Sequence, residues 1–326
     1  MEQKTLGTTG PATSAIGLGC MGFSQAYGPA DDEVSAAVIR DALDHGITLI
    51  DTAMSYGQGH NETLVGRAIA GRRDEVVLAT KFGIVRGEHG TRLDGRPGNV
   101  RGYCEASLRR LGADHIDLYY LHRVDPDVPV ADTVGAMAEL VAAGKVRHLG
   151  LSEVDPAQLD QAAAVHPIAA VQFEWSLAWR EPEDDVVPAA RRIGAGLVPY
   201  SPLGRGLLTG TLPAGPFPVG DFRRADPRFG PEHLPANLAL VRALAEVAEA
   251  HGVTPGQLAL AWLLARGPDV VPIPGTRSRR RVAENAAAAG VRLAEKDLAA
   301  LDAAVPREGW RGDRTSFAAH GTARTR

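Results

Sequence analysis

The feature that most constrains the fold is an alternation that runs through nearly the whole chain. Short apolar segments rich in β-branched residues alternate with longer segments that are rich in Ala and Leu and have a helical period. This pattern indicates βαβ units arranged round a parallel sheet. The predicted strands are Ser14–Gly19, Ile47–Asp51, Val76–Thr80, Ile116–Leu121, His148–Leu151, Ala169–Gln172, Gly196–Pro199 and Val270–Ile273. Eight such units predict an α/β fold of the (β/α)8 or TIM-barrel type, for which 326 residues are sufficient.

Helices are predicted between these strands, and several of them open with the Asp, Asn or Pro that suits a first helical turn. They are Glu33–His45, Glu62–Ala70, Val100–Leu111, Val130–Ala143, Ala157–Ala164 and Asp185–Ile193. We expect one domain over residues 1–310.

Two regions break the alternation of strands and helices. Gly206–Pro235 is rich in Gly and Pro and longer than an ordinary connection, which predicts either a functional loop or partial disorder after the seventh strand.

The second exception is Arg311–Arg326, which is polar and has no apolar face. We expect most of this C-terminal tail, residues 311–326, to be mobile, and we assign it no chemistry.

Composition excludes several classes of function. The net charge of -4 gives no general attraction to nucleic acid. The two cysteines, Cys20 and Cys104, are far apart and have no histidine at ligand spacing, so no metal site is predicted. The start MEQKTLGTTG lacks the basic and apolar regions of a signal peptide, and no apolar run approaches about 20 residues. We therefore expect a cytoplasmic protein without a membrane partner; the sequence carries no signal for an oligomeric state.

Four ionisable residues follow or end consecutive predicted strands. Asp51 ends the second strand in ITLIDTAMSYG with Tyr56 just beyond it, Lys81 follows the third in VVLATKFG, and His122 follows the fourth in IDLYYLHRV. The active site of such a barrel lies at the carboxyl ends of its strands, so these side chains are expected to converge. Taken singly, each has an ordinary interpretation as a turn residue, a packed ring or a solvated charge. Together they favour catalysis.

Their chemistry suits one task. A tyrosine with a reference pKa of about 10 is a poor acid near neutral pH, and an adjacent ammonium is expected to move that pKa downward. Lys81 is the candidate for that ammonium, with Asp51 keeping it charged and aimed. His122 would orient a carbonyl or share the proton relay. Of the 35 Lys and Arg residues only four are Lys, which indicates that a compact ammonium is required at position 81.

Several ordered blocks resemble the aldo-keto reductase family from about Thr5 to Ala304. The blocks are TLGTTGPATSAIGLGCMG, LIDTAMSYGQGHNETLVGRAI, LATKFG, IDLYYLHRVD, LGLSE, VQFEWSL, VPYSPLGRGLLTG and PIPGTRSRRRVAEN. The first is similar to the family's N-terminal hairpin, which adds that element to the predicted barrel. CMGFSQAYGP, LSE and HPIAAVQFEWSL resemble the branch that includes perakine reductase and the auxin-induced-like reductases.

The resemblance implies an NADPH-dependent enzyme that reduces aldehydes or ketones by direct hydride transfer. Tyr56 would donate the proton, Lys81 and Asp51 would tune it, and His122 would position the carbonyl. The implied contacts of NADPH/NADP+ fall into three groups: Ser152, Gln172 and Tyr200 at the nicotinamide; Gly22, Ser201, Leu203, Gly204, Arg205 and Gly206 near the turn and pyrophosphate; and Gly275, Thr276, Arg277, Arg281, Glu284 and Asn285 at the adenosine end. The family often has Asn at the position of Glu153 and a basic residue at that of Ser278.

The substrate is less constrained. Phe23, Trp175 and Trp179 are candidates for the wall of a hydrophobic pocket, and Met54 and Phe82 are weaker candidates. Core packing is an equal alternative for each. Two other functions fit the same fold: a nucleotide-binding redox sensor or scaffold subunit, like the potassium-channel β subunits, and a Schiff-base aldolase that uses Lys81.

Overall fold

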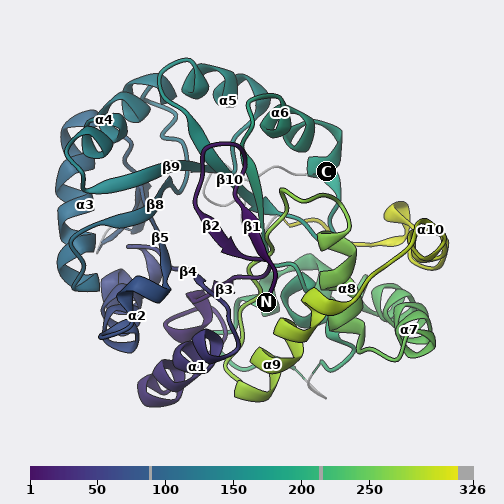
Figure 1. The fold of residues 1–326 in the computed structure, drawn as a ribbon. Coiled ribbons are helices and arrows are strands. Elements are labelled where there is room, and N and C mark those ends of the chain that lie inside the picture. The colour runs from purple at the N-terminus through teal and green to yellow at the C-terminus, as the bar shows by residue number, and fades with distance from the viewer. Residues whose placement is uncertain (88–89, 213–215, 315–326) are drawn as a thin grey trace.

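Seven parallel strands form most of a barrel in the computed structural model, which describes residues 1–87, 90–212 and 216–314 (Figure 1). Their order round the barrel is β11-β10-β9-β8-β5-β4-β3. The bounds are β3 (Leu18–Gly19), β4 (Leu49–Asp51), β5 (Val77–Phe82), β8 (Ile116–Leu121), β9 (Val146–Ser152), β10 (Ile168–Glu174) and β11 (Gly196–Tyr200). The predicted barrel is confirmed, and the first seven predicted strands overlap these elements.

The eighth predicted strand, Val270–Ile273, closes the ring without forming a regular ladder. On one side Val271 N donates to Leu197 O at 2.9 Å and Ile273 N to Pro199 O at 3.0 Å; on the other Gly17 N donates to Pro272 O at 2.9 Å and Gly19 N to Pro274 O at 3.3 Å. The ladder is incomplete because Pro272 and Pro274 have no N–H to donate.

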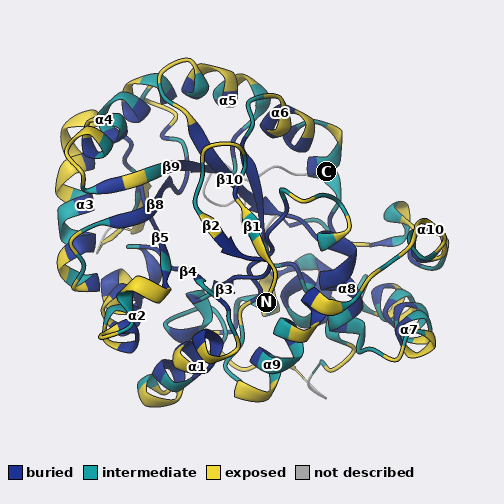
Figure 2. Cartoon of the chain, viewed as in Figure 1, coloured by how far each residue is buried: buried dark blue, intermediate teal, exposed yellow. Residues whose placement is uncertain are grey.

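Ten helices are described, and those that follow the strands form the outer ring in Figure 1. They are α1 (Asp32–Asp44), α2 (His60–Ile69), α3 (Pro97–Leu111), α4 (Val130–Ala142), α5 (Pro156–Ala163), α6 (Val186–Arg192), α7 (Leu234–Ala250), α8 (Pro255–Leu264), α9 (Arg279–Ala287) and α10 (Glu295–Ala304). Most of them have exposed outward faces and buried inward faces (Figure 2), as amphipathic sequences predict, whereas α8 has no exposed residue. No helix in the described ranges is long and apolar enough to span a membrane.

The barrel interior is packed with side chains. The cluster comprises Leu6, Leu49, Ala79, Leu118, Tyr120, Ala169, Ala170, Val198, Val271 and Ile273. Leu6 belongs to the hairpin of β1 (Gln3–Thr5) and β2 (Ala12–Ser14), which lies across the amino end of the barrel (Figure 1). Gly150 makes room for the largest of these side chains, because a Cβ there would lie 2.4 Å from the ring of Tyr120.

Parts of the two irregular regions are ordered where the structure describes them, in residues 206–212, 216–235 and 311–314. Gly206–Pro235 contains 3-10 turns at Phe222–Ala225 and Pro227–Phe229, and its last residues already belong to α7. Arg314, within the predicted mobile tail, has a side chain only 2% exposed. The rest of that prediction concerns residues 315–326, which lie outside the described part of the chain.

Candidate active site

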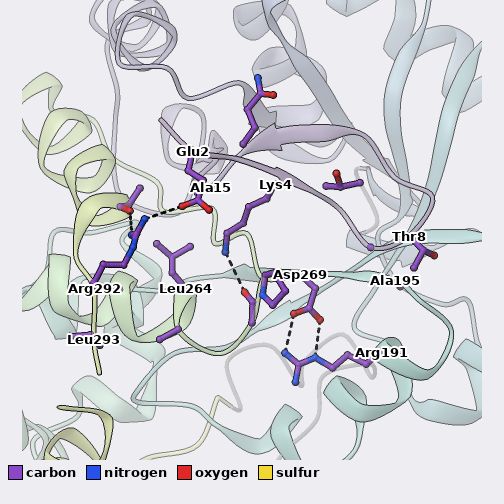
Figure 3. Close-up of a pocket in the computed structure, with 18 of the residues that line it drawn as sticks. Glu2, Lys4, Thr8, Ala15, Arg191, Ala195, Leu264, Asp269, Arg292 and Leu293 are labelled. Carbon is purple, nitrogen blue, oxygen red and sulfur yellow. Dashed lines mark hydrogen bonds and ion pairs between the residues drawn. The ribbon is translucent and has the colours of Figure 1, made fainter. Parts of the chain in front are cut away.

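Two cavities of similar size lie at opposite ends of the barrel. One of about 700 Å³ lies beside the N-terminal hairpin, where β1, parts of α6 and α8, and the loops before β11 and before Val270 line it (Figure 3). Four of its charged groups form two ion pairs, Arg191 with Asp269 and Arg292 with Glu2, and Lys4 donates to the carbonyls of Gly267 and Val270. The other, of about 710 Å³, opens where the strands end and contains Asp51, Tyr56 and His122 in its wall. The second cavity is therefore the candidate active site, because barrels of this kind carry their chemistry at the carboxyl ends.

Lys81 lies fully buried behind this cavity, in β5. Its Nζ forms an ion pair and hydrogen bond with Asp51, donates to Thr52 O at 2.7 Å, and donates to the Tyr56 hydroxyl at 3.3 Å. Three acceptors match the three protons of an ammonium. Asp51 and Thr52 thus hold the ammonium in place, so that its third N–H points at the Tyr56 hydroxyl.

The pKa values of this chain of groups follow from burial and from the ion pair. Burial alone lowers the pKa of Lys81, but Asp51 and Tyr56 outweigh it, so the net pKa of Lys81 is raised. Burial raises the pKa of Tyr56 more than the Lys81 ammonium lowers it. The expectation of a net downward shift for Tyr56 is therefore wrong, because the phenol is desolvated as well as paired. Tyr56 is consequently protonated and available as a donor.

His122 completes the group. Its ring meets that of Tyr56 edge-on at a centroid distance of 5.7 Å, and its Nδ1 lies 3.5 Å from Ser55 Oγ. Burial, followed by the charges of Arg123 and Lys81, lowers the pKa of His122 well below its usual value. The imidazole is therefore neutral and can donate a hydrogen bond to a carbonyl without carrying a charge.

Ser152, Gln172 and Tyr200 line the wall next to Asp51. Gln172 Nε2 donates to Asp51 Oδ2 at 2.9 Å, so the carboxylate is held from the side opposite Lys81. Ser152 Oγ accepts from Arg123 at 3.1 Å, and the Tyr200 hydroxyl donates to Glu153 Oε1 at 2.9 Å. Three adjacent strand ends thus present polar groups of fixed orientation to the cavity.

The segment after β11 has an unusual backbone. Ser201 and Arg205 have φ values of 48° and 59°, and Gly204 and Gly206 are also left-handed. Such conformations cost about 1–3 kcal/mol for residues other than glycine and concentrate at functional sites. Ser201, Leu203, Arg205 and Gly206 line the cavity, whereas Gly204 does not.

The side chain of Arg205 already forms ion pairs within the protein. Its guanidinium pairs with Asp226 and with Glu174, the latter at 3.3 Å. Both carboxylates are buried, so the charge of Arg205 is balanced inside the protein. Backbone groups of this segment are consequently better placed than its guanidinium to meet a ligand phosphate.

The block after the eighth strand lies at the far side of the same cavity. Gly275, Thr276, Arg277 and Arg281 line it, together with Gly22. Arg277 donates to four backbone carbonyls, those of Gly22, Tyr27, Gly28 and Pro29. These hydrogen bonds show that the Arg277 guanidinium holds the 22–29 loop in place. Arg281 donates to Thr211 Oγ1 at 2.8 Å, and Ser278 begins α9 without a side-chain cap among the described residues.

Glu284 and Asn285 do not line the cavity. Thr254 Oγ1 donates to Glu284 at 2.8 Å, and Asn285 is buried. Both residues thus belong to α9, where Glu284 contacts the N-cap of α8, and neither is on the cavity wall.

The three aromatic residues proposed for the substrate pocket do not line the cavity either. Phe23, Trp175 and Trp179 are each at most 2% exposed. Trp175 packs on Trp262 at a centroid distance of 6.1 Å, so the core-packing alternative describes it better.

The wall beside His122 is built instead by a second hairpin, β6 (Ile84–Gly87) and β7 (Gly90–Leu93). Ile84, Arg86 and Leu93 contribute its side chains. This hairpin is absent from the elements predicted above, although two short runs around a Gly-containing turn in GIVRGEHGTRL are typical of a hairpin.

Comparisons with known proteins agree with this geometry. Residues 15–306 match the model of the aldo/keto reductase family. The chain is 46% identical over 309 residues to "Probable aldo-keto reductase 1" of Glycine max, covering 94% of this chain and 89% of that protein.

Two solved structures resemble the whole barrel. A glycerol dehydrogenase from Gluconobacter oxydans superposes with a TM-score of 0.87 at 33% identity, covering 94% of this chain and 95% of that one. An aldo/keto reductase from Klebsiella pneumoniae in complex with NADP and acetate superposes with a TM-score of 0.72 at 32% identity, covering 94% and 96%. The family match over most of the chain and the close curated relative lead to one conclusion: this protein belongs to the aldo/keto reductase family.

Proposed function

We propose that the protein is an NADPH-dependent carbonyl reductase in which Tyr56 donates the proton. The observation that carries this proposal is the buried chain from Asp51 through Lys81 to the Tyr56 hydroxyl, which ends at a cavity that His122 also lines. A carbonyl reduced by hydride must receive a proton on oxygen, and these groups can deliver one.

The cavity suits a polyanionic nucleotide. Within the described residues its wall carries six arginines, namely Arg86, Arg123, Arg205, Arg223, Arg277 and Arg281, and a single carboxylate, Asp51. Arg205 and Arg223 already pair with buried carboxylates, so the other four are the arginines that would attract an anionic ligand. The first turn of α9 adds a helix N-terminus, which favours phosphate. NADPH, when bound, would supply the hydride that reaches the carbonyl carbon. Ser152, Gln172 and Tyr200 would hold its nicotinamide, and Arg281 its 2′-phosphate.

The residues of the chain would divide the remaining work. Neutral His122 would donate a hydrogen bond to the carbonyl oxygen and orient the carbon. Tyr56 would transfer its proton to that oxygen as the hydride arrives, which yields the alcohol. The phenolate left behind would be stabilised by the Lys81 ammonium at 3.3 Å, and Asp51 would keep that ammonium in place.

Burial argues against the aldolase alternative. A Schiff base requires a neutral amine that can reach the substrate. Lys81 is fully buried, does not line the cavity, and has a pKa raised by Asp51 and Tyr56 after burial is overcome. A charged and enclosed amine is a poor nucleophile.

The experiment is a Tyr56→Phe variant assayed with a panel of aldehydes and ketones under single-turnover conditions. The rate should fall by about 10²–10⁴-fold, the usual value of general-acid assistance, while the Kd of NADPH stays within about twofold. Tyr103→Phe is the matched control, because its hydroxyl donates to Asp94 at 2.8 Å and it does not line the cavity. Near-full reduction by Tyr56→Phe would refute the donor assignment. NADPH binding by the wild type without turnover of any carbonyl would favour the sensor alternative.

A further inference from the structure

Glu153 has a conformation and a set of contacts that the proposed chemistry does not require. It follows Ser152 at the end of β9, its φ is 55°, and its side chain is 2% exposed. A left-handed backbone at a residue other than glycine is costly unless the surroundings enforce it. The contacts of Glu153 therefore explain how its left-handed backbone is maintained.

Glu153 ties together three strand ends. Its N–H donates to Gln172 O at 3.0 Å, and its Oε1 accepts from Glu174 N at 3.1 Å, which joins β9 to β10. The same Oε1 accepts from the Tyr200 hydroxyl at 2.9 Å, which joins both to β11. These are the strand ends that carry Ser152, Gln172 and Tyr200, the proposed nicotinamide wall.

A buried carboxylate needs a counter-charge, and here the counter-charge comes from beyond the barrel. Arg314 lies far beyond α10, its side chain is 2% exposed, and it pairs with Glu153. Its Nη1 is also 3.0 Å from Glu153 Oε1, 3.4 Å from the Tyr200 hydroxyl and 3.5 Å from Glu174. The guanidinium lies 5.0 Å from the ring centroid of Trp179. Arg314 is thus enclosed on several sides.

The pair belongs to a larger buried network. Glu174 pairs with Arg205 and Arg228, and both arginines pair with Asp226. Arg314 and Glu153 join this group through Glu174. Loss of one arginine would leave a carboxylate without compensation in a desolvated site, which is strongly destabilising locally. Glu153 would then turn outward, which breaks its bond to Tyr200, or take up a proton, which weakens that bond because a neutral carboxyl is a poorer acceptor than a carboxylate.

We propose that Arg314, in the segment after the barrel, is a positioning residue for the cofactor: by holding Glu153 it fixes Tyr200 and the wall against which the nicotinamide lies. The inference rests on the proposed function, since it takes Tyr200 as part of the nicotinamide site. It assigns a role to the C-terminal segment, whose residues make no direct contact with the cavity in the described part of the chain.

The test measures the Kd of NADPH from nucleotide fluorescence, together with the melting temperature, for full-length variants. Arg314→Met should weaken NADPH binding by about tenfold. In a Tyr200→Phe background, which lacks the hydroxyl that Glu153 holds, the same change should alter Kd by less than about twofold. Arg314→Lys, which keeps a charge near Glu153, should recover much of the affinity.

Arg180→Met is the matched control. Arg180 is another largely buried arginine, pairing with Glu183 and with Asp302 of α10, but it does not line the cavity or contact Glu153. Its loss should lower the melting temperature and leave the Kd of NADPH unchanged. If Arg314→Met behaves like Arg180→Met, Arg314 acts through stability alone and the positioning role is refuted. If it weakens NADPH binding equally with and without the Tyr200 hydroxyl, Arg314 does not act through Tyr200, and the role is refuted as well.

A second variant covers the case in which Arg314→Met does not fold. Glu153→Leu combined with Arg314→Met removes both charges, and such replacements of buried pairs are often neutral for stability. This double variant should fold and bind NADPH as weakly as the single variant is expected to; wild-type affinity would overturn the inference. Failure of the wild type to bind NADPH would instead refute the proposed function.

Discussion

Replacing Lys81 by Met provides a quantitative test of the buried ion pair. The substitution retains an unbranched apolar side chain and removes the ammonium that Asp51, Thr52 and Tyr56 share. Among the residues that the structure describes, Asp51 would keep only the Gln172 amide, at 2.9 Å, as a side-chain donor. The side chains of Lys81 and Asp51 are 0% and 4% exposed, so water offers little compensation. Loss of one partner from such a pair costs about 3–5 kcal/mol of unfolding free energy.

The cost should depend on pH with a definite sign. Burial already raises the pKa of Asp51, against the opposing effect of Lys81, and removal of the ammonium would raise it further. The folded state would then bind a proton that the unfolded state, with an Asp pKa of about 3.9, has released. Stability should therefore fall as pH rises above about 4, by up to about 1.4 kcal/mol per pH unit, until the folded pKa is reached.

Urea unfolding monitored by tryptophan fluorescence at pH 5 and pH 7.5 measures this difference. Lys81→Met should lose more stability at pH 7.5, and the double variant Asp51→Asn, Lys81→Met should recover most of it at both pH values. Lys4→Met is the control, because Lys4 donates to the carbonyls of Gly267 and Val270 and has no buried carboxylate partner among the described residues. A loss below about 1 kcal/mol at pH 7.5, or one equal at both pH values, would refute the reasoning.

Three further predictions concern the cavity and its surroundings. Arg281→Glu should raise the Kd of NADPH far more than that of NADH, whereas Arg277→Ala should weaken both because its guanidinium holds the 22–29 loop; titration of each variant with both nucleotides decides this. His122→Gln should lose less stability on acidification than the wild type does. Burial lowers the pKa of His122, so the unfolded wild type binds a proton that the folded state does not, and its stability falls as pH drops below about 6.5. Thermal unfolding at pH 5 and 7.5 should show a smaller drop for the variant. Limited proteolysis should cut near Val219, which is 86% exposed, and spare Asp226–Phe229, where Asp226 and Arg228 are buried; mass spectrometry of the fragments checks the order, and saturating NADPH should slow the cut if the segment covers the cofactor.

The barrel could be predicted from the sequence because its strands carry a local signal. Buried parallel strands read as short apolar runs, and Ile116–Leu121 was located to the residue. Lys81 was expected just beyond its strand but lies inside β5, since the pairing with β8 continues to Phe82. The eighth predicted strand, Val270–Ile273, closes the ring by hydrogen bonds on both sides, but its prolines prevent a regular strand. Strand ends then gave the approximate location of the four candidate catalytic residues, because parallel strands of one barrel end on one face.

Interactions between distant segments could not be predicted in the same way. The network of Glu153 and Arg314 joins residues 161 positions apart, and neither has a local pattern that names the other. The direction of the Tyr56 pKa shift also required the structure, because it depends on the balance between desolvation and the Lys81 charge. Trp175 and Trp179 illustrate a third limit: a large aromatic residue near a strand end has the same sequence signature whether it faces the cavity or the core.

The hairpin at the amino end has a consequence for how the chain folds during synthesis. Leu6 packs inside the barrel against residues that come from as late in the sequence as Ile273. Thr8 N donates to Gly194 O at 2.8 Å. Leu6 and Thr8 leave the ribosome long before Gly194 and Ile273, so they have no completed docking site until most of the chain has followed them. Strand β3 must likewise wait for residues 270–274 before the ring closes, because Gly17 and Gly19 donate to Pro272 and Pro274. Early intermediates would expose open sheet edges, and the chain would depend on rapid closure or on chaperones to avoid aggregation until its last strand emerges.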